Sequence, residues 1–246
     1  MRQAATPGLL LALETSGDVC SVAVQRGDQF VAEHRFRHGM HLSERLMGHV
    51  DAVLKEAEAT LEEVTAFAVG IGPGSFTGTR IGVMTVKTLA AVTGKPLFGV
   101  SGLEALAAEF VGIQNALIAP VLPCRTGVVF TALFAEEGEA PRSVTEPAAL
   151  SLDALSALIL EHAPSSVVFC GPAALRYEEA LRAALAESSL SLSFVRACDP
   201  GAAQIAWLAS RRLAAGLPSD DPFALVPLYI APPPITLPKR PPPSSV

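Results

Sequence analysis

The sequence predicts an α/β protein built from two similar halves. Each half begins with short apolar segments of strand length and continues with alternating helical and strand-like segments. The length of 246 residues suits one large domain or two small ones. Hydrophobic residues make up 50% of the chain and charged residues only 17%, which excludes a mostly disordered protein. The similar plan of the halves indicates an internal duplication, although no sequence repeat accompanies it.

The first half predicts three antiparallel strands followed by alternating helices and strands. Apolar residues recur at helical spacing from Leu42 to Leu61, with Ser43 as the expected N-cap. A second helix is expected over 80–93, ended by Gly94, and Ser101 is expected to open a third helix with a capping box. The expected strands are 9–13, 19–24, 30–36, 66–71 and 97–100.

The second half repeats this alternation with shorter segments. Apolar segments of strand length alternate with segments of helical spacing, as they do in the first half. Its expected strands are 117–122, 128–134, 167–170 and 193–196, and its expected helices are 151–163, 173–187 and 202–215. The last sixteen residues, 231–246, hold seven prolines and predict a disordered or extended tail. The alternative is an extended peptide that binds a partner.

Charge and apolar patterning exclude several classes of protein. The net charge of −6 argues against a chain that grips nucleic acid by itself, because phosphate binding needs a concentrated basic surface. The apolar runs are far shorter than the ~20 residues that a spanning helix needs, and no signal peptide is apparent. The four cysteines form no Cys-x-x-Cys pair, so free thiols are expected. We therefore expect a cytoplasmic protein with no membrane contact.

A glycine-rich loop over 72–78 is the first candidate site. It lies between an expected strand and an expected helix, where backbone N–H groups hold anions well, and Arg80 adds positive charge. The loop matches neither the P-loop pattern nor the dinucleotide-binding pattern. The alternative is structural, since glycines also permit a tight and closely packed turn.

Other candidate chemistry is sparse. His34, His38 and His41 have a spacing that can suit zinc, and the alternative is that they are exposed polar residues at a sheet edge. No serine lies in a nucleophile elbow. Glu14 directly follows the first expected strand, where a kinase of the actin or hexokinase type carries an aspartate.

The helix expected at 80–93 has apolar or small residues on nearly all sides. Such a helix is buried on more than one side, either by its own sheet or by another protein. Gly82, Met84 and Thr85 would allow close approach of a partner, and Met47 on the preceding helix lies off its apolar stripe. The helices therefore leave a partner surface as an open alternative.

Three segments together resemble the TsaB (YeaZ) family. They are LLALETSGDVCSVAV, HLSERLMGHVDAVLKEA and AFAVGIGPGSFTGTRIGVMTVKTLAAVTGKPLFGVSGLEALA. The resemblance implies an actin-like ATPase (ASKHA) fold with two domains, each a mixed sheet flanked by helices. It implies an N-terminal domain over 1–108, a C-terminal domain over 109–201, and a return of 202–230 to the first domain.

The resemblance also implies a function. TsaB proteins are inactive paralogues of TsaD and pair with TsaD through their first two helices, largely as they pair with themselves. With the ATPase TsaE they support transfer of threonylcarbamoyl to the adenosine beside the anticodon of tRNA. The chain is thus expected to be a non-catalytic subunit that forms a heterodimer or a homodimer, meets tRNA only indirectly and needs no cofactor. ATP and Mg²⁺ would act through its partners.

The chain differs from the family pattern at positions where the family carries carboxylate residues. Glu14 replaces the usual Asp, and the second-domain segment at 122–130 keeps Arg125 and Gly127 but lacks the usual Asp and Glu. A scaffold tolerates such losses and an active phosphotransferase does not. The expected partner residues are Met47, Val50, Leu54, Met84, Lys87 and Thr88.

An active ATPase or phosphotransferase of the same fold is the alternative function. It would use the loop at 72–78 together with Mg²⁺. The expected nucleotide-binding residues are Glu14, Thr15, Ser16, Gly72, Gly74 and Arg80.

Overall fold

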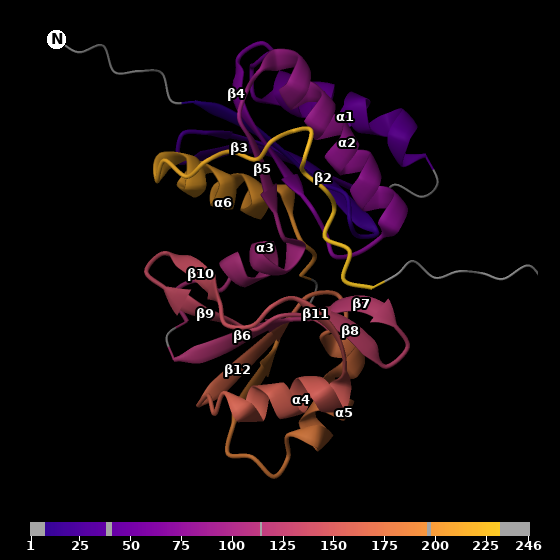
Figure 1. Cartoon of the computed structure of the whole chain (residues 1–246), viewed down its shortest axis with the longest axis vertical. Helices are drawn as coiled ribbons and strands as arrows, with labels where there is room; N and C mark the ends of the chain where they lie inside the picture. The colour runs from indigo at the N-terminus through magenta and orange to yellow at the C-terminus, as the bar shows by residue number, and fades with distance from the viewer. Residues whose placement is uncertain (1–7, 38–40, 114, 196–197, 232–246) are drawn as a thin grey trace, which may run out of the picture.

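The computed structural model describes residues 8–37, 41–113, 115–195 and 198–231. Two five-stranded sheets, one from each half of the chain, lie at opposite ends of an elongated molecule (Figure 1). Helix α3 (Gly102–Ala108) lies between them and packs against both α6 (Ala202–Ala214) and the second sheet. We call the two ends the first and the second domain.

The two sheets have the same topology. Their strand orders are β3-β2-β1-β4-β5 and β10-β9-β6-β12-β13, and in each the central strand pairs antiparallel on one side and parallel on the other. This correspondence confirms the two-fold plan that the sequence predicts. The strands of the first sheet are β1 (Leu9–Glu14), β2 (Val19–Arg26), β3 (Gln29–Arg37), β4 (Val64–Gly70) and β5 (Leu97–Val100). Those of the second are β6 (Ala116–Pro120), β9 (Phe134–Glu137), β10 (Ala140–Ser143), β12 (Ser166–Cys170) and β13 (Ser191–Phe194).

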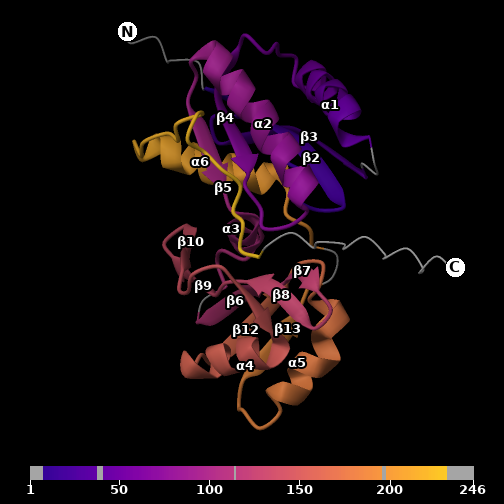
Figure 2. The same cartoon turned by 45° about the vertical axis from the view of Figure 1, so that its right-hand side comes forward.

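Helices cover both faces of the first sheet. Because side chains alternate along a strand, β1 sends Leu11 and Leu13 to one face and Leu10 and Ala12 to the other. The first set packs under α1 (Leu42–Glu56) and α2 (Phe76–Thr93), and the second set packs on α6. The chain therefore returns to the first domain after it has completed the second (Figure 2).

The second sheet is covered in the same way. One face packs on α4 (Leu152–Glu161) and α5 (Glu178–Ala184), and the other packs on the apolar side of α3. A further sheet has three strands in the order β11-β8-β7, of which β7 and β8 lie between β6 and β9 in the chain and β11 follows β10. Its members are β7 (Leu122–Arg125), β8 (Val128–Thr131) and β11 (Ala148–Ser151), and a 3-10 turn, η1 (Leu175–Tyr177), precedes α5.

Several expected boundaries are wrong for physical reasons. Helix α1 begins at Leu42 after His41, so Ser43 is not its N-cap. Helix α2 begins four residues earlier than expected, with Ser75 as its cap, because the glycines of the loop continue into the helix. The single helix expected at 173–187 is η1 followed by the short α5. The single strand expected at 128–134 is divided into β8 and β9. The sequence did not indicate β7, β10 and β11, which are short and lack strong alternation.

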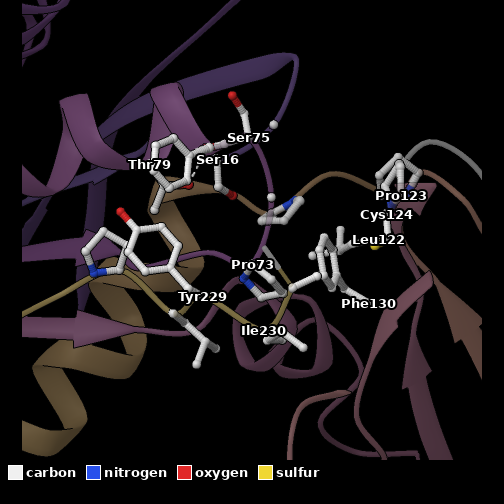
Figure 3. Close-up of a pocket in the computed structure, with 18 of the residues that line it drawn as sticks. Ser16, Pro73, Ser75, Thr79, Leu122, Pro123, Cys124, Phe130, Tyr229 and Ile230 are labelled. Atoms are coloured by element: carbon white, nitrogen blue, oxygen red, sulfur yellow. Dashed lines mark hydrogen bonds between the residues drawn. The ribbon is translucent and has the colours of Figure 1, made fainter. Parts of the chain in front are cut away.

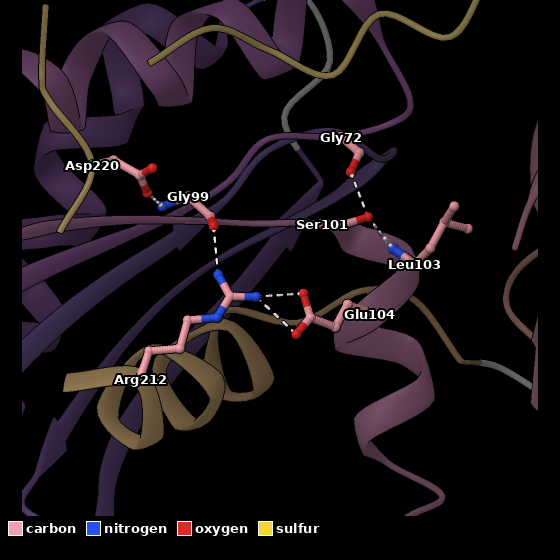
Figure 4. Close-up of polar contacts among 7 residues, drawn as sticks. All are labelled: Gly72, Gly99, Ser101, Leu103, Glu104, Arg212 and Asp220. Carbon is pink, nitrogen blue, oxygen red and sulfur yellow. Dashed lines mark hydrogen bonds and ion pairs between the residues drawn. The ribbon is translucent and has the colours of Figure 1, made fainter. Parts of the chain in front are cut away.

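Polar contacts fasten α3 and α6 to the first sheet (Figure 4). Arg212 on α6 donates to both carboxylate oxygens of Glu104 on α3, at 2.8 and 2.6 Å, and to the Gly99 carbonyl oxygen at 2.8 Å. Ser101 caps α3 as expected, since its hydroxyl accepts from the Leu103 N–H. The Glu104 carboxylate pairs with Arg212, so only the Ser101 half of the expected capping box is formed.

The last segment that the structure describes, residues 217–231, has no regular structure, and we call it the strap. Residues 232–246 of the expected proline-rich tail lie outside the described residues. The strap passes over the first domain beside α2 and ends between the two domains (Figure 1). All four cysteines are free, as expected, and burial raises the pKa of the Cys20 thiol to about 12. Among the helices that the structure describes, none combines the length and apolarity of a membrane span.

Candidate functional site

The first turn, residues 14–18, connects β1 to β2 and faces the second domain. Its carboxylate, Glu14, is fully buried, and one of its oxygens accepts a hydrogen bond from the Ser16 N–H at 2.6 Å. The other oxygen lies against Gly70, where any side chain would overlap it, and has no hydrogen-bond partner. Burial raises the pKa of Glu14 above its usual 4.5. Glu14 therefore lies in the interior rather than facing a ligand.

The glycine-rich loop packs directly on this turn. The Ser75 N–H donates to the Ser16 carbonyl oxygen at 2.6 Å, and the Thr15 hydroxyl donates to the Gly78 carbonyl oxygen at 2.8 Å. A Cβ atom at Gly74 would overlap the Ser16 carbonyl oxygen, and one at Gly78 would overlap that of Thr15. These glycines are thus required for close contact between two backbone segments, which is the structural interpretation of the motif.

A pocket of ≈ 590 Å³ lies between the domains, beside the loop and the turn (Figure 3). Its lining is largely apolar and carries three charged residues, Asp18, Arg125 and Asp199. The second domain contributes mainly β7 and Phe130, and the strap contributes 227–231. Phe130 and Asp199 were not among the expected site residues.

The expected nucleotide-binding residues do not gather at this pocket. Ser16 and Gly74 line it, whereas Glu14, Thr15 and Gly72 are buried outside its lining. Arg80 is exposed on α2, with its guanidinium 5.0 Å from the Phe76 ring centroid.

A nucleotide with Mg²⁺ fits this donor set poorly. The carboxylate expected to face the metal is in the interior, and the pocket holds two carboxylates against one guanidinium. The described residues contain no group of three side chains suited to a metal ion. We therefore derive no chemical step through a nucleotide in this chain.

Three histidines of the described residues contact neighbouring side chains of the first domain. His34 hydrogen-bonds Glu56 at 2.9 Å, and His41 lies 3.3 Å from a carboxylate oxygen of Glu44. The ring of His49 stacks on Phe36, with ring centroids 3.6 Å apart. His38 lies outside the described residues, so the expected trio is not tested as a whole.

The expected partner residues fall into two groups. Val50 and Leu54 are buried in the core of the first domain, so they were wrong as surface residues. They belong to the apolar stripe of α1, and that stripe packs on its own sheet. Met47, Met84 and Thr88 are exposed, and Lys87 is half-buried because its ammonium donates to the Leu225 carbonyl oxygen at 2.6 Å.

Replacing Glu14 with glutamine should remove a pH dependence of stability. A carboxyl whose pKa is raised on folding binds its proton more tightly in the folded state, so stability falls as pH rises above the unfolded value near 4.5. The free energy of unfolding of the wild-type protein should fall by up to about 1.4 kcal/mol per pH unit through this group. The fall should stop once the pH exceeds the pKa of Glu14 in the folded protein. Glu14→Gln should lack that loss. Urea unfolding at pH 5 and pH 7.5 measures it, and parallel pH profiles of the two proteins would contradict the assignment.

Two domains of one topology, with a cleft between them, define the class of actin-like ATPase folds. Solved structures agree with this class. A Pseudomonas aeruginosa protein described as similar to the peptidase YeaZ superposes with a TM-score of 0.76 at 26% identity, over 91% of this chain and 100% of that one. YeaZ from the same organism gives 0.74 at 26%, over 90% and 99%. A ROK hexokinase from Thermus thermophilus gives 0.54 at 15%, over 85% and 100%, a likeness of fold alone.

Sequence comparison gives the family. The model of the TsaD family, described as tRNA N6-adenosine threonylcarbamoyltransferase, matches residues 38–235. The TsaB protein of Bacillus subtilis, named for tRNA threonylcarbamoyladenosine biosynthesis, is 36% identical over 125 residues, or 51% of this chain and 54% of that protein. Escherichia coli TsaB is 35% identical over 98 residues, or 40% and 42%. The chain belongs to the TsaD family and, within it, to the TsaB (YeaZ) group. The matched segments span about half of these relatives or less.

Proposed function

We propose that this chain is the non-catalytic partner of a TsaD-type transferase in the synthesis of threonylcarbamoyladenosine in tRNA. One observation carries the proposal, an exposed stripe along α2. Every fourth residue of this helix from its first turn to its last is exposed, although the opposite side is buried in the core. The stripe consists of Phe76, Arg80, Met84, Thr88 and Val92.

The stripe has the composition of an interface. Three of its residues are large and apolar, namely Phe76, Met84 and Val92. Another is Arg80, and arginine is enriched in protein–protein interfaces. Met47 on α1 adds one more exposed apolar side chain. A second copy of the chain would present the same stripe, so an isologous homodimer and a heterodimer would compete for it.

The closed first turn supports a chain that does not catalyse the reaction by itself. Glu14 is buried and the loop at 72–78 is packed against the turn, so neither is free to act on a phosphate. We therefore propose that ATP and Mg²⁺ enter the reaction through TsaD and TsaE. The net charge of −6 supports tRNA binding by the partners rather than by this chain.

Reconstitution tests the proposal. TsaD and TsaE from the same organism are mixed with tRNA, ATP and the threonylcarbamoyl adenylate, with or without this chain. Modified adenosine measured by mass spectrometry should accumulate only when the chain is present. Equal accumulation without it would contradict the proposed role.

A nucleotide-using enzyme remains the second candidate, because the cleft of ≈ 590 Å³ is lined by Ser16 and Gly74. Calorimetry of the isolated chain with ATP and Mg²⁺ separates the two functions. We expect no binding at millimolar nucleotide. Binding at that concentration would favour the enzyme.

A further inference from the structure

We propose that the strap forms the second side of the docking surface on α2 and that the TsaD-type subunit contacts the strap and the helix together. This inference rests on the proposed function and adds to it a segment more than 120 residues away from α2 in the sequence. The strap residues concerned are Phe223, Val226 and Tyr229.

The backbone of the strap is anchored to the first domain along its length. At β5 the Asp220 N–H donates to the Leu97 carbonyl oxygen at 2.8 Å, and the Asp220 carboxylate accepts from the Gly99 N–H at 2.7 Å (Figure 4). Farther along, the Leu228 N–H donates to the Ile71 carbonyl oxygen at 2.7 Å. Leu225 packs against the first core. The strap is therefore held by hydrogen bonds and by apolar packing.

Large apolar side chains nevertheless point outward from this anchored backbone. Phe223 is 82% exposed and Val226 is 65% exposed, and Tyr229, which also lines the pocket between the domains, is 50% exposed. Leu225 and Leu228 alternate with them and are partly buried. Because the backbone is already ordered, covering these side chains would cost little conformational entropy, which favours binding. Exposed apolar groups on an ordered segment are typical of an interface.

The strap and the exposed stripe of α2 form one continuous surface. The Lys87 ammonium contacts the Leu225 carbonyl oxygen at 2.6 Å, and the rings of Phe76 and Tyr229 lie 5.1 Å apart between centroids. The strap thus runs antiparallel to α2, from its fourth turn back to its first (Figure 2). A subunit that covers Met84 would therefore meet Val226 as well.

The size of a stable interface supports this extension. A standard interface covers roughly 800 Å² on each partner and depends on a few aromatic or arginine anchors. On α1 and α2 the exposed large apolar side chains are Met47, Met84 and Val92, together with the partly exposed Phe76. The strap adds three further large apolar side chains, two of them aromatic. The occupant we assign is the TsaD-type subunit, because its docking surface on α2 continues into the strap.

The test is the affinity of TsaD for a strap variant. Phe223→Ser and Val226→Ser are combined, and the dissociation constant for TsaD is measured by calorimetry. We expect at least a ~10-fold weaker complex, with an unchanged melting temperature because both side chains are exposed. The matched control is Leu160→Ser on α4 of the second domain, which is also exposed and should bind like wild type.

The outcomes separate the strap from the proposed function. If wild-type protein does not bind TsaD, both proposals are overturned. If wild type binds and the double variant binds within twofold of it, the strap proposal alone is overturned. A variant that loses only self-association, measured by light scattering, would also overturn it, because the occupant would then be a second copy.

Discussion

Replacing Met84 with glutamate should abolish co-elution of this chain with TsaD. Met84 lies at the middle of the exposed stripe of α2 and is 58% exposed in the isolated chain. In the complex a carboxylate at this position would be buried without a partner, and such burial costs several kcal/mol. We expect affinity to fall by a factor of about 100 or more, since each 1.4 kcal/mol is tenfold.

The control for Met84→Glu is Phe30→Glu on β3. Phe30 is 56% exposed on the edge strand opposite β5, so the two variants add the same charge at similar exposure. Phe30→Glu should co-elute with TsaD like wild type. Both variants should keep the melting temperature of wild type. Co-elution of Met84→Glu at wild-type affinity would remove α2 from the interface.

Replacing Gly78 with alanine should destabilise the fold strongly. The new methyl group would overlap the Thr15 carbonyl oxygen, and this backbone atom is fixed by the strand that precedes it. Either α2 must move away from the first turn or the turn must open. Overpacking of this kind costs about 3 kcal/mol in unfolding free energy. Chemical denaturation monitored by circular dichroism measures the loss.

Gly48→Ala is the matched control for Gly78→Ala. Gly48 is also helical, on the exposed side of α1, and a Cβ atom there meets no atom within 4 Å. The same substitution should therefore raise stability by about 0.5–1 kcal/mol, because alanine favours a helix more than glycine does. If the two substitutions changed stability equally, Gly78 would act only as a residue of the helix, and its close contact with Thr15 would not require a glycine.

The architecture followed from sequence pattern to a large extent. Apolar runs and helical spacing predicted every strand of the first sheet. The repeated plan predicted a second α/β half, but not its strands β7, β10 and β11. The start of α2 was not predictable by the usual rules, because glycines are read as loop residues. Gly78 and Gly82 lie inside the helix, buried against Thr15, and only the three-dimensional contact explains them. Local pattern carries no information on such a contact.

The site was less predictable than the fold. Val50 and Leu54 share the helical stripe that marks a core, and the sequence does not say whether a stripe faces its own sheet or a partner. Glu14 occupies the position of a catalytic carboxylate but is closed off by residues more than fifty positions away. The strap meets α2 only through the tertiary fold, and its contact with Lys87 joins residues 138 positions apart.

The most direct test of the central claim is the mass of the assembly in solution. Size-exclusion chromatography with light scattering is run on this chain alone, on TsaD alone and on their mixture. We predict a new species in the mixture with the summed mass of one chain of 25.6 kDa and one TsaD subunit, formed at the expense of any homodimer. A mixture that elutes as the two separate proteins, at concentrations well above a micromolar, would contradict the claim that this chain is a partner subunit of TsaD.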